Sequence, residues 1–215
     1  MGTFVVIVVI IIVIVFAVNI SKGRAQANEE RLIENYTSGN YDEVIKSLSK
    51  KEFGITSDKL MMLADSYFKT GDFENGSKYM KEAEQESTPY RRNEIYKLWG
   101  LALYNEKDYE GAISMLQKYD QDEIKEDAKQ FNSYDVPKLL GVSFMALEEW
   151  ELAINAFKKA PLGAKNQNSE LAMLNELTGD CYKELGKAAM AKKHYNLALT
   201  TEYKKSIKNK IKEIE

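Results

Sequence analysis

Two patterns of hydrophobic positions divide this chain. From Phe4 to Val18, fifteen successive residues carry no polar side chain. Beyond residue 24, apolar residues instead recur three or four positions apart, with charged and amide side chains between them. That spacing places apolar side chains on one face of a helix. The pattern predicts an all-helical domain preceded by one uniformly apolar segment.

The apolar segment has the length of a membrane-spanning helix. Thr3 to Ile20 would measure about 27 Å as an α-helix, which just crosses a bilayer core. A cleaved signal peptide is the alternative, since Ala25-Gln26-Ala27 offers a cleavage site. However, no basic residue precedes the segment, and Lys22 and Arg24 follow it. The sequence therefore favours a retained anchor at residues 1–24, crossing the membrane through residues 3–20.

The basic residues near this segment predict an orientation. Lys22, Arg24 and Arg31 all follow it, so the positive-inside rule places the amino terminus outside and the remaining chain in the cytoplasm. A single cysteine, Cys181, is compatible with a reducing compartment. We therefore expect a single-pass membrane protein.

The remainder of the chain contains a spacing that occurs four times. In one copy, Gly141 is followed by Phe144, Ala153 and Phe157. Small residues let two helices approach closely, and the aromatic residues fill the space between layers. Each copy is thus a helical hairpin that buries its apolar face only by stacking on its neighbours. The four copies have their first small residue at Ala64, Gly100, Gly141 and Gly179.

A turn is expected in the middle of each hairpin. A degraded fifth copy near Leu32 and Val44 comes before the other four and has a turn of its own. The separations between successive turns are 32, 36, 41 and 38 residues, and the longest one contains a polar insert at about residues 122–135. The expected turn residues are Gly39, Gly71, Lys107, Glu148 and Gly186.

At Trp99-Gly100, Tyr109 and Ala112, and at their counterparts in the other copies, the chain resembles the tetratricopeptide repeat. The resemblance implies an all-α fold, a solenoid of about five stacked hairpins over residues 25–199. Residues 200–215 are expected to form a capping helix, with Ile207, Ile211 and Ile214 on one buried stripe. The alternative for this lysine-rich helix is contact with anionic lipid.

In tetratricopeptide proteins, the first helix of each hairpin lines a concave groove that holds partner peptides. Met61 and Asp65 stand where the family's carboxylate clamp needs a Lys-Asn pair, which argues against that ligand class. The groove instead suits a partner with apolar anchors, and we expect Asp65, Asp135 and Asp180 to attract some basic residues on it. The resemblance places the binding residues at Phe68, Lys97, Leu101, Tyr104, Lys138, Val142 and Met145.

Composition argues against several other functions. The net charge of −3 provides no basic field for nucleic acid. One cysteine and one histidine cannot build the common metal sites, and no phosphate loop or nucleophile elbow is present. We therefore expect no catalysis, cofactor, metal or small-molecule substrate.

The sequence predicts a membrane-anchored scaffold or adaptor that holds a protein partner at the membrane. An alternative is an exported, membrane-tethered chaperone-like factor for secreted or envelope clients. A third possibility is self-assembly through the ends of the solenoid.

Overall fold

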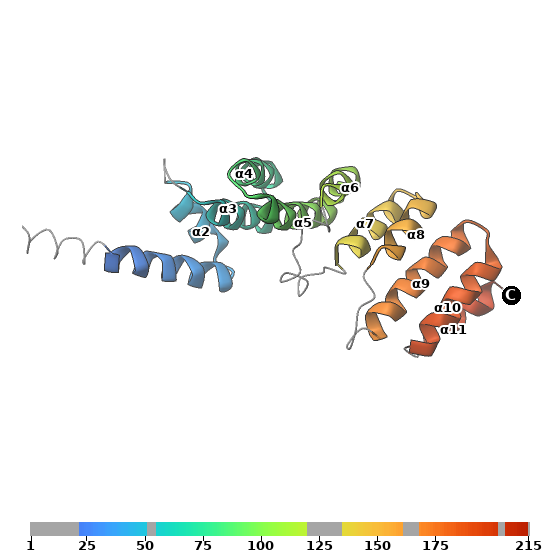
Figure 1. Cartoon of the computed structure of the whole chain (residues 1–215). Coiled ribbons are helices and arrows are strands. Elements are labelled where there is room, and N and C mark those ends of the chain that lie inside the picture. Colours follow the sequence, from blue (N-terminus) through green and yellow to red (C-terminus); the bar gives the residue numbers. More distant parts are fainter. Residues whose placement is uncertain (1–21, 51–54, 120–134, 161–167, 202–204, 215) are drawn as a thin grey trace, which may run out of the picture. The chain divides into compact units, whose positions relative to one another are not determined.

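The computed structural model describes residues 22–50, 55–119, 135–160, 168–201 and 205–214 (Figure 1). All regular secondary structure in these ranges is helical, which confirms the expected all-α class. The chain divides into two compact units, Met1–Ala83 and Glu84–Glu215. The helices are residues 22–37, α2 (Tyr41–Leu48), α3 (Ser57–Lys69), α4 (Phe73–Gln85), α5 (Pro89–Glu106), α6 (Tyr109–Gln117), α7 (Asp135–Ala146), α8 (Trp150–Lys158), α9 (Asn168–Glu184), α10 (Ala188–Thr201) and α11 (Lys205–Glu213).

The first unit is built on the helix of residues 22–37 together with α2, α3 and most of α4. Its core contains Leu32 from the first helix, Val44 and Leu48 from α2, and Leu63 from α3. The degraded first copy therefore forms a helical pair that packs on the next one. Stacked tyrosine rings on α3 and α4 adjoin this cluster, with 5.5 Å between ring centroids.

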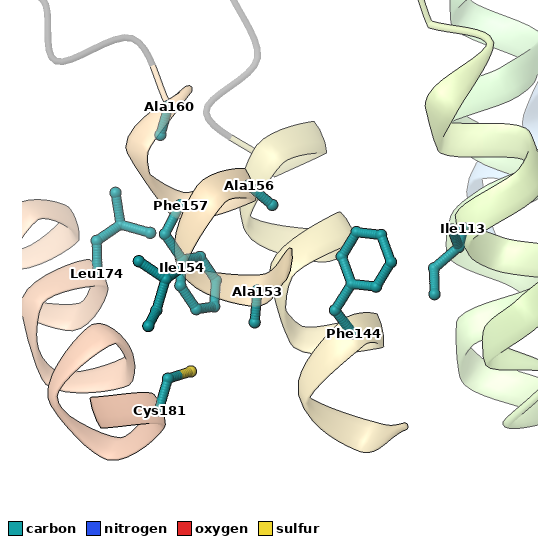
Figure 2. Packing of buried hydrophobic residues seen from close by; sticks show 9 residues of the cluster. All are labelled: Ile113, Phe144, Ala153, Ile154, Ala156, Phe157, Ala160, Leu174 and Cys181. Carbon is teal, nitrogen blue, oxygen red and sulfur yellow. The ribbon is translucent and has the colours of Figure 1, made fainter. Parts of the chain in front are cut away.

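The second unit consists of three helical hairpins, α5/α6, α7/α8 and α9/α10, followed by α11. Successive hairpins pack through α6 against α7 and through α8 against α9. Figure 2 shows the second of these junctions, where Ile154 and Phe157 of α8 face Leu174 and Cys181 of α9. This stacking is that of the expected α-solenoid.

Small residues bring the two helices of each hairpin together. A Cβ atom added at Gly100 would lie 2.6 Å from Leu116 Cγ. Cβ atoms in proteins essentially never approach another heavy atom so closely. The same clash would occur between Gly141 and the ring of Phe157. It recurs between Gly179 and the ring of Tyr195, again sixteen residues further along the chain. The repeat register expected from the sequence is confirmed by these contacts.

Five residues in the described ranges have positive φ, and all five are the expected turn residues. Two of them are not glycine, Lys107 at 69° and Glu148 at 60°. This left-handed conformation reverses the chain between the two helices of a hairpin. The three glycines are Gly39, Gly71 and Gly186, with φ of 77°, 85° and 68°.

The last helix, α11, covers the end of the α9/α10 hairpin. Ile207 is fully buried against Tyr195 and Ala198, and Ile211 and Ile214 pack at the edge of the same cluster. An end helix of this kind shields an apolar surface that would otherwise face water.

The predicted single-pass membrane localisation needs correction. Among the described residues, no helix combines the length and the apolar composition that crossing a bilayer requires. Even α5, with 18 residues the longest helix in these ranges, carries Arg92, Glu94 and Lys97. The expected span at residues 3–20 lies outside the described residues, as does most of the insert at 122–135.

Candidate functional site

Six of the seven expected binding residues lie on two helices of the second unit. α5 carries Lys97, Leu101 and Tyr104, and α7 carries Lys138, Val142 and Met145. Spacings of three and four residues place each set on one helix face. α5 and α7 also contact each other, so the six residues belong to neighbouring faces. We call these six residues the α5/α7 face.

Leu101 is the most exposed apolar residue of the α5/α7 face, with 40% of its surface accessible. Covering so exposed a leucine with a partner removes apolar surface from water, which favours binding. Beside it on α5, Tyr104 is half-buried and packs against Leu116, Val136 and Leu139, so it also holds two successive hairpins together.

Val142 and Met145 form the apolar part of the face on α7. Both are half-buried and pack against the core cluster that contains Phe144 and Phe157. Their positions are fixed by packing, while part of each side chain stays accessible. The face thus combines an exposed leucine with apolar residues held by the core.

An ion pair joins the two helices of this face. Lys97 Nζ lies 3.3 Å from Asp135 Oδ2, and Lys97 is partly exposed while Asp135 is largely exposed. Surface pairs of this kind contribute about 0–1 kcal/mol. We expected Asp135 to attract a basic partner residue, but it is already paired within the chain.

Two other groove carboxylates also have internal partners, which we did not predict. In the first unit the Tyr36 hydroxyl donates to Asp65 Oδ2 at 2.7 Å, and burial followed by this hydrogen bond raises the pKa of Tyr36. In the second unit Asp180 accepts a 2.8 Å hydrogen bond from the Tyr195 hydroxyl. Both aspartates directly follow the small first residue of their copy, Ala64 or Gly179. This shared position in the repeat could have indicated from the sequence that the two carboxylates have similar hydrogen-bond partners.

The last hairpin's groove positions are occupied by α11. Lys210 Nζ lies 2.9 Å from Glu176 Oε1 and 2.8 Å from Asp180 Oδ2, and Lys183 Nζ lies 2.6 Å from Glu213 Oε2. Burial alone would lower the pKa of Lys210, but its hydrogen bonds with Asp180 and Glu176 outweigh burial and raise it. The charged groove positions of α9 are therefore engaged by the chain itself.

Phe68, the seventh expected residue, lies in the other unit and is only 8% exposed. Its ring occupies the space where a side chain at Gly76 would stand, 5.8 Å from the ring of Phe73. The corresponding residue is alanine in the other copies, at Ala112 for example. Glycine at this position made room for the ring, so Phe68 contributes to packing and offers a partner little surface.

Neither Cys181 nor His194 forms part of a reactive arrangement. Cys181 is fully buried, and desolvation raises the pKa of its thiol to about 12. His194 is half-buried, stacks on Tyr182 and lies 3.1 Å from Asn175 Oδ1. Within the described ranges, no group of three or more His, Cys, Asp or Glu residues could hold a metal ion.

A profile of the tetratricopeptide repeat family matches residues 60–86 and 177–205. These segments correspond to the α3/α4 hairpin and to the α9/α10 hairpin from Leu177 onward. The chain contains tetratricopeptide repeats. No curated protein matches it in sequence.

Solved structures resemble most of the chain. MamA MSR-1 is 20% identical, with a TM-score of 0.61 over 81% of this chain and 94% of that one. MamA AMB-1 is 20% identical, with a TM-score of 0.64 over 86% and 97% of the two chains. The APC/C hetero-tetramer Cut9-Hcn1 is 15% identical, with a TM-score of 0.57 over 85% and 34%. At these identities the likeness establishes the fold alone.

Proposed function

We propose that this chain is a scaffold or adaptor that binds a segment of a protein partner on the α5/α7 face, without catalysis. The exposure of Leu101 beside half-buried Tyr104, Val142 and Met145 is the observation that supports this most directly. Binding energy at protein interfaces concentrates in a few such residues held in place by their surroundings. Repeat proteins also present extended surfaces suited to peptide segments.

The internal ion pairs of the groove carboxylates indicate which kind of partner residue supplies the affinity. Asp135 pairs with Lys97 on the face itself, and Asp180 pairs with Lys210 on α11. Basic residues on a partner would have to compete with these internal pairs. We therefore propose that apolar side chains supply most of the affinity and that binding weakens only modestly with salt.

The test is affinity capture with the full-length chain and its Leu101→Asp variant. A carboxylate at this position would be desolvated by a bound apolar segment, so we expect at least a tenfold loss of captured partner. Leu197→Asp on α10 is the matched control, because Leu197 is 42% exposed and Leu101 is 40% exposed. Loss of the same partner from both variants would contradict the proposed site.

Leu101 suits this test better than Tyr104 and Met145. Truncating Tyr104 and Met145 together would also remove contacts with the two core clusters that hold successive hairpins together. A loss of binding in that double variant would not separate recognition from stability. Leu101 avoids this problem because it is exposed.

A further inference from the structure

A second apolar surface lies between the second helices of two successive hairpins. α6, α7 and α8 surround a pocket of about 520 Å³. Val136, Leu140 and Phe144 of α7 line it, together with Leu116 of α6 and Ala156 of α8. This pocket shares no residue with the α5/α7 face, since α7 presents different positions to each.

The pocket opens where the repeat spacing is greatest. The turn residues on either side of it, Lys107 and Glu148, are 41 residues apart. Leu152 of α8 lines the pocket with 47% of its surface exposed. Leucine at such a position places apolar surface in water unless another molecule covers it.

Among the described residues that line the pocket, the charge has one sign. Lys159 is the only charged residue of that set, accompanied by the amides Gln117 and Asn155. Lys159 is exposed, and none of the ion pairs seen among the described residues involves it. An exposed cation beside an apolar pocket favours an occupant that carries a carboxylate.

We propose that the α6–α8 pocket docks a short segment of a second protein partner, with large apolar side chains and a carboxylate that pairs with Lys159. Its apolar side chains cover Leu140, Phe144 and Leu152, and its acidic residue lies at the Lys159 rim. The exposure of Leu152 and Lys159 favours a protein segment, because small-molecule sites enclose most of their ligand. The chain thereby gains a second binding surface beside the α5/α7 face.

The experiment selects peptides from a phage-displayed library of random sequences on the immobilised full-length chain. Selected peptides are synthesised, and their affinities are measured by fluorescence polarisation. We expect a class rich in Leu, Ile or Phe together with Asp or Glu. This class should bind the Leu152→Asp variant at least tenfold more weakly than the wild type, since the new carboxylate repels the peptide's own.

Two matched variants separate the pocket from general surface effects. Met190 occupies on α10 the position that Leu152 occupies on α8, and it is 37% exposed outside the pocket. Met190→Asp should leave peptide affinity unchanged. Lys159→Glu should weaken binding at least tenfold, while Lys158→Glu, next to it but outside the lining, should change it less than twofold. Circular dichroism melts establish that each variant is folded.

Four results would overturn the proposal. The first is a selection in which no peptide depends on Leu152. The second is a Leu152-dependent class rich in Lys and Arg. The third is self-association of the wild type in sedimentation experiments that Leu152→Asp abolishes, which would make a second copy of the chain the occupant. Loss of the same peptides on Leu101→Asp would instead assign them to the α5/α7 face and equally contradict a separate pocket.

Discussion

At the scale of single residues, Gly141 determines how closely α7 and α8 approach. A Cβ atom at this position would overlap the ring of Phe157, which is itself buried in the core. The ring has little room to move, because Ile154 and Leu174 belong to the same cluster. Interiors packed at this density respond to the addition of a single methyl group.

Gly141→Ala should therefore destabilise the fold by about 1–3 kcal/mol through overpacking. Urea unfolding followed by circular dichroism measures the change. Gly23→Ala is the control, because a Cβ there meets no atom within 4 Å, and its stability should be unchanged or slightly higher. An unchanged midpoint for Gly141→Ala would contradict the helix contact on which the repeat register rests.

Lys107 illustrates the cost of a left-handed turn residue. Its φ of 69° costs a residue with a side chain about 1–2 kcal/mol, while glycine adopts this conformation freely. Lys107→Gly should stabilise the chain by about 0.5–1 kcal/mol once the greater freedom of unfolded glycine is included. Thermal melts measure this.

Lys159→Gly gives the opposite expectation, because Lys159, which caps the carboxyl end of α8, has an ordinary φ of −82°. It should destabilise by about 0.5–1 kcal/mol. Equal effects of the two substitutions would show that backbone strain at Lys107 is unimportant.

The sequence was a good guide to the turn residues and small contact residues, but not to Phe68. Spacing determines which face of a helix a residue occupies, and it placed Phe68 on the groove face. The direction of its ring depends on the empty space at Gly76, which belongs to the next helix. Three-dimensional packing therefore determines how much of Phe68 is accessible, and its spacing in the sequence does not.

At the scale of elements, α11 is held on the α9/α10 hairpin by apolar contacts with α10 and charged contacts with α9. Ile207 supplies the buried contact, and Lys210 bridges Glu176 and Asp180 across 30 and more residues of sequence. The apolar stripe of this helix was predictable from its spacing. The pairing of Lys210 was not, because it depends on how α11 is rotated when it stacks.

Removing the charge of Lys210 should loosen α11. Lys210→Met leaves Glu176 and Asp180 without their cation, so amide hydrogen exchange within α11 should accelerate several-fold. Lys212→Met on the same helix is the control, since Lys212 is exposed, and exchange should stay as in the wild type. Equal exchange in both variants would mean that Ile207 alone retains the helix.

Acid should also weaken the attachment of α11 to α9, through the ion pair between Glu213 and Lys183. Its hydrogen bond with Lys183 lowers the pKa of Glu213 below the ordinary value of 4.5. The bond therefore contributes stability above about pH 4.5 and loses it as the pH falls through the lowered pKa. Exchange in α11 should accelerate over that acidic range, and Glu213→Gln should remove this part of the pH dependence. A pH profile identical in wild type and Glu213→Gln would contradict it.

At the scale of the whole molecule, the described chain is all-helical and divides into two compact units, and it contains tetratricopeptide repeats at residues 60–86 and 177–205. The repeat class could be predicted because small and aromatic residues recur at fixed spacing. The expected membrane topology was not supported, since hydropathy identifies a candidate segment without showing how it is placed.

The central claim is that a partner binds on the α5/α7 face. It is tested most directly by placing the photocrosslinking amino acid benzoylphenylalanine at Leu101 in the full-length chain, with Leu197 as the equally exposed control. Illumination in cells that naturally express the protein should yield a crosslinked partner from position 101 that is absent from position 197. Crosslinks to the same partner at position 197 and none at position 101 would contradict the account.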